Sequence, residues 1–176
     1  MKNDVMDVVP RPVGTLVTSK WIYKIKHVAY GSIEKHKERF VARGFSQKEG
    51  IDYEETFALV ARYTSIRSVL YLDEVMQWKI HQMDVKTTFL NGVVEEEVYV
   101  EQPLGFETHD RKSHVCKLKA LYGLKQASRT WYGRMDSFLI SLGFTKSKAD
   151  SNLYYKVEEV NPVILLLYVD DMFVIG

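Results

Sequence analysis

The stretch Val163-Ile-Leu-Leu-Leu-Tyr168-Val169-Asp170-Asp171-Met-Phe-Val-Ile175 decides the fold. Seven consecutive apolar or aromatic residues, 163–169, come before two aspartates, and a second apolar run follows them. Seven residues are too few for a membrane helix, which needs about 20, but they suit a buried strand. Aspartate is common in turns because it tolerates turn geometry and hydrogen-bonds its own backbone. The stretch therefore predicts two buried strands joined by a turn at Asp170 and Asp171.

A third aspartate ends another expected strand, residues 79–84. If Asp84 meets Asp170 and Asp171, the cluster needs a cation, because like charges a few ångströms apart raise one another's pKa. Mg²⁺ prefers such oxygen ligands. Two ions about 4 Å apart would activate a hydroxyl and stabilise a leaving pyrophosphate. This chemistry leaves a polymerase and a nuclease equally open.

The remaining pattern predicts an α+β fold. Alternating residues indicate a basic two-stranded hairpin over residues 20–43. One helix is expected to begin at a Thr64 or Ser65 cap and to end before Trp78. A second helix has apolar residues at helical spacing from Trp131 and is closed by Gly143. Strands and helices interleave without a repeating βαβ unit, which favours an antiparallel sheet.

Composition excludes several classes of protein. The 176 residues are 46% hydrophobic with a net charge of +1, which argues against disorder and a collagen-like repeat. The lone Cys116 excludes an internal disulfide, and no second thiol is present at the spacing of a zinc module. Charge is uneven: residues 1–50 carry 10 basic and 5 acidic groups, whereas residues 51–110 carry 4 and 12. The basic block either binds polyanions or is a solvated hairpin, and charge alone leaves both open.

Four boxes in order resemble the copia-type LTR retrotransposon reverse transcriptase. The fourth is Tyr168-Val169-Asp170-Asp171, the Tyr-x-Asp-Asp box, which alone would be a weak signal. The earlier boxes are Val41-Ala-Arg-Gly-Phe-Ser-Gln47, Asp84-Val-Lys-Thr-Thr-Phe-Leu-Asn-Gly92 and Leu121-Tyr-Gly-Leu-Lys-Gln-Ala127. Together they span nearly the whole chain from Trp21, so the resemblance to this polymerase family is specific.

The resemblance implies a right-hand polymerase with an antiparallel palm sheet and packed helices. We expect a loose leader over residues 1–13, fingers over 14–60 and 93–126, and palm over 61–92 and 127–176. The palm would stop after the catalytic hairpin, with the thumb absent. The expected activity is RNA-directed DNA synthesis by a two-metal-ion mechanism, and the chain alone is expected to be inactive.

The resemblance also assigns roles to individual residues. The catalytic and metal-binding set is Asp84, Asp170 and Asp171, with the backbone of Val85 as a further metal ligand. Nucleotide contacts are assigned to Lys37, Arg39, Phe89, Tyr122 and Gly123, where Phe89 is either a gate against the ribose 2′-hydroxyl or a core aromatic. Template or primer contacts are assigned to Arg43, Gln126 and Tyr168.

The implied cofactor is Mg²⁺, with Mn²⁺ as the alternative. The implied partners are an RNA template, a DNA primer, deoxynucleoside triphosphates and the thumb, connection and RNase H segments of the same Pol polyprotein, without a membrane. The implied location is a cytoplasmic virus-like particle. The chain has Thr88 where the family usually has alanine, and Leu118-Lys119-Ala120 has one lysine where two are common. A non-catalytic remnant and a repurposed RNA-binding module therefore stay open as alternatives.

Overall fold

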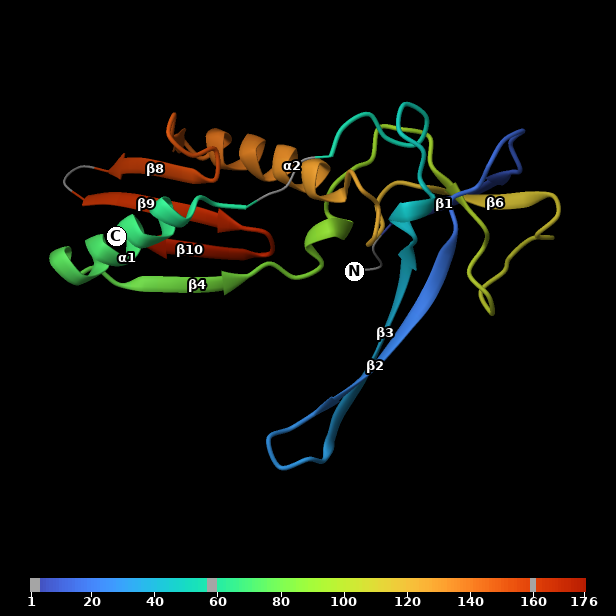
Figure 1. Cartoon of the computed structure of the whole chain (residues 1–176), viewed down its shortest axis with the longest axis horizontal. Coiled ribbons are helices and arrows are strands. Elements are labelled where there is room, and N and C mark those ends of the chain that lie inside the picture. The colour runs from blue at the N-terminus through green and yellow to red at the C-terminus, as the bar shows by residue number, and fades with distance from the viewer. Residues whose placement is uncertain (1–3, 57–59, 159–160) are drawn as a thin grey trace. The chain divides into compact units, whose positions relative to one another are not determined.

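The computed structural model describes residues 4–56, 60–158 and 161–176 (Figure 1). It divides into two units, each assembled from two segments of the chain. The first unit contains residues 1–56 and 92–127, and the second contains residues 57–91 and 128–176. The resemblance predicts fingers over residues 14–60 and 93–126, and palm over residues 61–92 and 127–176. Residues 1–3 of the predicted leader and residues 57–59 of the predicted fingers lie outside the described residues.

The second unit is built on a five-stranded antiparallel sheet with the order β4-β10-β9-β8-β7. The hairpin predicted from the opening stretch forms its centre, although Asp171 is the first residue of a strand and the turn is Val169 with Asp170. These strands are β4 (Ile80–Asp84), β7 (Thr145–Lys146), β8 (Leu153–Glu158), β9 (Asn161–Tyr168) and β10 (Asp171–Ile175). The predicted α+β class is confirmed.

Two helices cover the two faces of this sheet. Successive residues of a strand point to opposite faces, so the continuous apolar run of β9 supplies both. Leu165 and Leu167 pack in one cluster with Trp131, Met135 and Leu139 of α2 (Ala127–Ser141). Leu166 packs in the other cluster with Val69 of α1 (Tyr63–Met76). Burial on both faces explains why the sequence shows no polar alternation here.

The start of α1 is held by a residue from a distant loop. The expected Thr64 or Ser65 cap is wrong, because the helix begins at Tyr63 and its N-cap residue Arg62 makes no side-chain cap. Instead the buried carboxylate of Asp150 accepts hydrogen bonds from the Arg62 N–H (2.8 Å) and the Ser65 hydroxyl (2.6 Å). A carboxylate at a helix N-terminus also interacts favourably with the helix dipole.

We expect Asp150→Asn to destabilise the protein at pH 7 by about 1–3 kcal/mol, since the charged hydrogen bonds are lost. Burial alone would raise the pKa of Asp150, but hydrogen bonds from Ser65, Asn152 and Arg62 outweigh it and lower the pKa. The stabilisation is therefore complete above the ordinary carboxyl pKa of about 4 and is lost as the pH falls further. Urea unfolding at pH 7 and at pH 2 tests this, because the two proteins should differ at pH 7 and converge at pH 2.

The first unit combines a long ribbon with a small sheet. The predicted hairpin is confirmed as β2 (Ser19–His27) paired with β3 (Ile33–Ala42). The expectation of a loose leader is wrong, because β1 (Met6–Pro10) pairs along its whole length with β6 (His114–Leu118). The partner strand is more than 100 residues away, so no local pattern reveals it. β5 (Tyr99–Val100) completes the sheet in the order β1-β6-β5.

Neither helix is both long and apolar enough to cross a lipid bilayer, within the part of the chain that the structure describes.

Candidate active site

The turn that carries Asp170 is strained. Val169 has a φ of 57°, a conformation that is a clear outlier for a β-branched residue and costs on the order of 1–3 kcal/mol. The surrounding contacts hold it: Tyr168 and Asp171 are directly paired across the two-residue turn, and the buried Trp131 of α2 donates its ring N–H to the Val169 carbonyl (3.3 Å). The fold therefore fixes the backbone on which the two aspartates stand.

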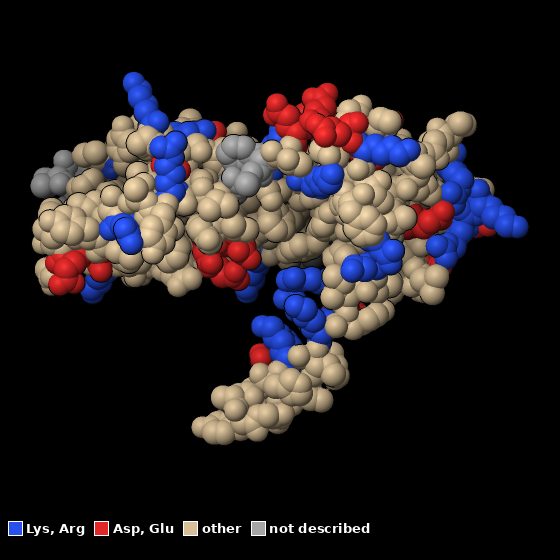
Figure 2. Space-filling model, in the orientation of Figure 1, with Lys and Arg blue, Asp and Glu red and all other residues tan. Residues whose placement is uncertain are grey.

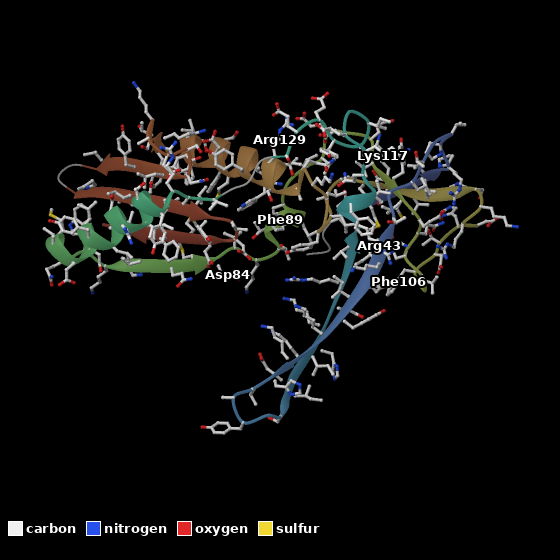
Figure 3. The ribbon with its side chains drawn as sticks, viewed as in Figure 1. Arg43, Asp84, Phe89, Phe106, Lys117 and Arg129 are labelled. Atoms are coloured by element: carbon white, nitrogen blue, oxygen red, sulfur yellow. The ribbon has the colours of Figure 1, made fainter. Side chains whose placement is uncertain are left out.

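The third aspartate reaches the same place through strand register. Asp84 at the end of β4 lies directly opposite Asp171 at the start of β10, and opposed residues in antiparallel strands point to the same face. The pairing continues one residue further, because the Val85 N–H donates to the Asp170 carbonyl (2.8 Å). Tyr168 is also opposite Asp171 and is 38% exposed. Figure 3 shows Asp84 at the end of its strand, with Phe89 in the segment that follows.

The donor atoms at this strand end suit a hard cation. Asp84 and Asp170 are exposed and Asp171 is half-buried, so carboxylate oxygens are available to an ion from solvent. One Asp171 oxygen accepts a hydrogen bond from the Gln82 amide (3.2 Å), a neighbour that no sequence signal identified. In the described residues, no three His, Cys, Asp or Glu side chains already form a group able to hold a metal ion. The backbone thus brings the aspartates together, while convergence of all three carboxylates stays a prediction.

The segment after Asp84 is braced by its own hydrogen bonds. Thr88 begins the short 3₁₀ helix Thr88–Leu90 and is 2% exposed, and its hydroxyl donates to the Val85 carbonyl (2.7 Å). A buried threonine in place of alanine therefore leaves no unpaired polar group. Phe89 is half-buried and packs against the cluster that includes Trp131 and Met135. This packing is consistent with a core aromatic, and a role as sugar gate stays a prediction.

The ribbon in the first unit has one basic face. In the register of β2 and β3, Lys24 is directly opposite Lys37, and Lys26 is opposite Lys35. Like charges in such pairs repel. The pKa of Lys37 is lowered, first by the charge of Arg39 and then by burial and the neighbouring lysines. Figure 2 shows Lys and Arg gathered along one side of the ribbon and an uncharged tip. A surface that repels itself in this way is suited to binding an anion.

Two glycines allow the loop with Tyr122 and Gly123 to approach the ribbon closely. Gly123 has a φ of 91°, and a Cβ added to it would lie 2.1 Å from the Ala42 carbonyl oxygen. A Cβ on Gly44 would lie 2.5 Å from the Gly123 carbonyl oxygen. The Ala42 N–H donates to the Tyr122 carbonyl (2.8 Å), and the Arg39 guanidinium lies over the Tyr122 ring, 4.9 Å from its centroid. The close approach thus brings together three residues that the resemblance assigns to nucleotide binding, Arg39, Tyr122 and Gly123.

A buried pair of amides fixes the other end of this loop. Gln126 is 0% exposed, and its amide nitrogen donates to the Asp52 carbonyl (2.9 Å). Its oxygen accepts from the amide of Gln47 (3.0 Å), whose own oxygen accepts the Lys125 N–H (2.8 Å). The assignment of Gln126 as a template or primer contact is therefore wrong, because it exposes no atom to a ligand. Gln47 was missed as a site-supporting residue, since nothing in its local pattern shows that its partner lies 79 positions away.

The comparisons with known proteins point to one family. The family model described as "Reverse transcriptase (RNA-dependent DNA polymerase)" matches residues 3–176. The chain is 46% identical, over 99% of its length, to "Retrovirus-related Pol polyprotein from transposon TNT 1-94" of Nicotiana tabacum, and 43% identical to the corresponding polyprotein from transposon RE1 of Arabidopsis thaliana. It covers 13% and 12% of these relatives, about an eighth of their length.

No solved structure matches the chain. The family match and the two polyproteins confirm the resemblance to copia-type elements drawn from the four boxes. The chain belongs to the reverse transcriptase family of RNA-dependent DNA polymerases.

Proposed function

We propose that the chain supplies the fingers and palm of an RNA-directed DNA polymerase, with the first unit as fingers and the second as palm. The observation that carries the proposal is the register that sets Asp84 opposite Asp171 and joins Val85 to the Asp170 backbone. The strain at the hairpin tip that carries these carboxylates lowers the stability of the fold, and such strain is typical of functional sites.

In the proposed reaction, the 3′ hydroxyl of a DNA primer loses its proton to solvent and its oxygen forms a bond to the α-phosphorus of a deoxynucleoside triphosphate, while the bond to the leaving pyrophosphate breaks. Mg²⁺ bound to the carboxylates would supply charge stabilisation for both oxygens. Asp84, Asp170 and Asp171 would hold it, together with the Val85 carbonyl. That carbonyl already accepts the Thr88 hydroxyl and retains a second lone pair.

The first unit would bind the incoming nucleotide. Lys37 and Arg39 lie on one face of the ribbon, since their register partners are Lys24 and Ile22, two positions apart. Arg39 is held against Tyr122, which orients its guanidinium. Lysine and arginine both suit phosphate oxygens, arginine in a bidentate manner. Phe89 in the second unit would contact the sugar, and the exposed Arg43 and Tyr168 would contact template or primer.

The RNA template, the primer and the remaining Pol segments, namely thumb, connection and RNase H, are the partners that this proposal requires. The rival function, a metal-independent RNA-binding module, is favoured by the basic ribbon alone. Metal dependence separates the two, because only the polymerase site needs the aspartates.

Replacing Lys37 and Arg39 together with glutamine is expected to weaken nucleotide binding about 100-fold, since two charge-assisted phosphate contacts are lost. The measurement is the dNTP concentration that half-saturates a labelled RNA–DNA primer–template complex in the presence of Mn²⁺. Lys112→Gln with Lys148→Gln removes the same charge elsewhere and is the control. If the double variant changes only the affinity for nucleic acid and its salt dependence, the two residues hold template phosphates and the nucleotide assignment is wrong.

A further inference from the structure

Two histidine rings lie side by side at the small sheet of the first unit. His109 is exposed in the loop between β5 and β6, and His114 is half-buried and is the first residue of β6. The centroids of the two rings are 4.6 Å apart, and the ring planes are inclined to each other by 31°. Neutral imidazole is a good ligand for copper, nickel and zinc ions, so two adjacent rings can share one ion.

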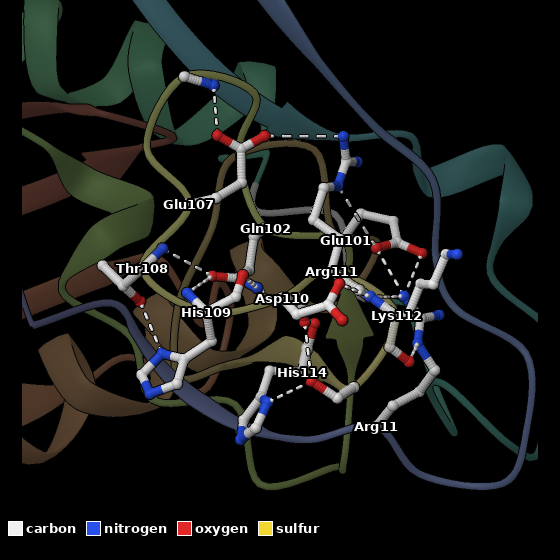
Figure 4. A network of polar contacts seen from close by, with 12 residues as sticks. Arg11, Glu101, Gln102, Glu107, Thr108, His109, Asp110, Arg111, Lys112 and His114 are labelled. Carbon is white, nitrogen blue, oxygen red and sulfur yellow. Dashed lines mark hydrogen bonds and ion pairs between the residues drawn. The ribbon is translucent and has the colours of Figure 1, made fainter.

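One buried side chain holds the backbones of both histidines. The amide nitrogen of Gln102, which is 1% exposed, donates to the carbonyls of His109 (3.0 Å) and His114 (3.2 Å). The amide oxygen of Gln102 accepts the N–H groups of Thr108 (3.0 Å) and His109 (3.3 Å). Figure 4 shows this network and the two rings beside it. The histidine pair is therefore positioned before any ligand arrives, which lowers the entropy lost when an ion binds.

A hydroxyl beside each ring determines which nitrogen is free. The Ser113 hydroxyl donates its proton to the Asp110 carbonyl (3.1 Å) and lies 2.9 Å from the Nδ1 of His114. Because that proton is already used, the Ser113 oxygen accepts the proton of Nδ1, which leaves the lone pair of the His114 Nε2 for a ligand. The Nδ1 of His109 has the same kind of neighbour, the Thr108 hydroxyl at 3.0 Å. Histidines that bind metals are typically oriented by such a second hydrogen bond.

The distance between the rings fits two neighbouring positions around one ion. An ion bound about 2.1 Å from a histidine nitrogen lies about 3.2 Å from the centroid of that ring. Two centroids that are 4.6 Å apart then subtend an angle of about 90° at the ion. This angle matches the tetragonal geometry of Cu²⁺ and Ni²⁺, whereas the tetrahedral geometry of Zn²⁺ would place the centroids about 5.2 Å apart. Since Cu²⁺ also has the highest affinity in the usual order of these ions, we expect it to bind most tightly.

The arginines near the histidine pair are neutralised by carboxylates. The Arg11 guanidinium is bound to both oxygens of Glu101 at 2.8 Å, and Arg111 forms an ion pair with Glu107 at 3.7 Å. Lys112 is exposed, so water and salt screen its charge. In the part of the chain that the structure describes, no third His, Cys, Asp or Glu completes a set of metal ligands. Water would therefore fill the other positions around an ion bound by the two rings.

We propose that His109 and His114 form a binding site for a late first-row transition-metal ion, with Cu²⁺ bound through the Nε2 atoms of both rings. The site differs in chemistry from the aspartates of the second unit, because imidazole nitrogen suits Cu²⁺ whereas carboxylate oxygen suits Mg²⁺. It does not depend on the proposed polymerase activity. A bound ion would tie the loop that follows β5 to the start of β6.

Titration of the chain, without a histidine tag, with Cu²⁺ tests the site directly when a large excess of Mg²⁺ occupies the carboxylates. We expect one bound Cu²⁺ whose electron spin echo envelope modulation shows two imidazole ligands. His109→Gln is expected to weaken binding at least about tenfold, since one of two ligands is lost, and to leave the signal of one imidazole. His36→Gln removes an exposed histidine from the ribbon of the same unit and is the matched control, so its affinity and signal should be unchanged.

A second variant tests how the ring of His114 is oriented. Ser113→Ala removes the partner of Nδ1 and is expected to weaken Cu²⁺ binding about tenfold, the lower end of the range for such a neighbour. Both imidazoles should stay in the echo signal, because both ligands are still present. Three results would overturn the proposal: a signal from one imidazole in the unmodified chain, equal Cu²⁺ affinities for His109→Gln and His36→Gln, or loss of Cu²⁺ binding when Mg²⁺ is in excess.

Discussion

Replacing Asp171 with asparagine is expected to lower the affinity of the chain for Mn²⁺ by at least about 100-fold. Asparagine keeps the shape of the side chain, but it removes the charge that faces Asp84 across the two strands. Losing even an outer neighbour of a metal ligand costs about 10–100-fold in affinity, so losing a charged ligand should cost no less. The free Mn²⁺ signal in an electron paramagnetic resonance titration measures the change directly and requires no catalysis.

The matched control is Glu74→Gln, which removes one exposed carboxylate from α1 of the same unit. Its Mn²⁺ affinity should equal that of the unmodified chain. If Asp171→Asn binds Mn²⁺ as tightly as this control does, the aspartates do not form the metal site, and the RNA-binding module becomes the better account of the chain.

Gly123→Ala is expected to destabilise the first unit by about 3 kcal/mol or more. Alanine at a φ of 91° destabilises the folded state by about 1–2 kcal/mol, because a Cβ is disfavoured in the left-handed region. Its Cβ would also lie 2.1 Å from the Ala42 carbonyl oxygen, a backbone atom that can move only if the ribbon moves. Hydrogen exchange followed by mass spectrometry should show first-unit amides exchanging about 100-fold faster.

Gly31→Ala separates these two causes. Gly31 has a φ of 84°, but nothing lies within 4 Å of an added Cβ. This variant should therefore show only the conformational cost. Equal effects of the two substitutions would mean that the close approach between Gly123 and Ala42 does not stabilise the unit.

Local patterns predicted the central hairpin, the ribbon and α2 because each depends on residues close in sequence. The apolar run 163–169 had the length of a strand, and the spacing from Trp131 was that of a helix. Gly143 does end α2, with a φ of 85°, and the Phe144 N–H donates to the Leu139 carbonyl (3.1 Å). These features follow from backbone periodicity and turn chemistry, which a single sequence displays.

The errors all involve contacts between distant residues. Residues Met6–Pro10 form a strand because they pair with β6. The cap on α1 comes from Asp150 rather than from Thr64 or Ser65. Gln126 is a polar residue in one of the four boxes, yet its amide is hydrogen-bonded inside the unit to Gln47 and Asp52. Nothing in the sequence near these residues shows which partner each will find, so propensity and motif could not reveal their roles.

The pairing of β1 with β6 also constrains how the chain can fold while it is being synthesised. About 110 residues separate the two strands, and ribosomes add roughly 5–20 residues per second. The β1 segment therefore waits about 5–20 s for its partner, whereas the β2–β3 ribbon is complete as soon as residue 42 emerges. During that interval the nascent chain exposes an unpaired strand that contains Val8 and Val9, and unpaired strand edges of this kind favour aggregation.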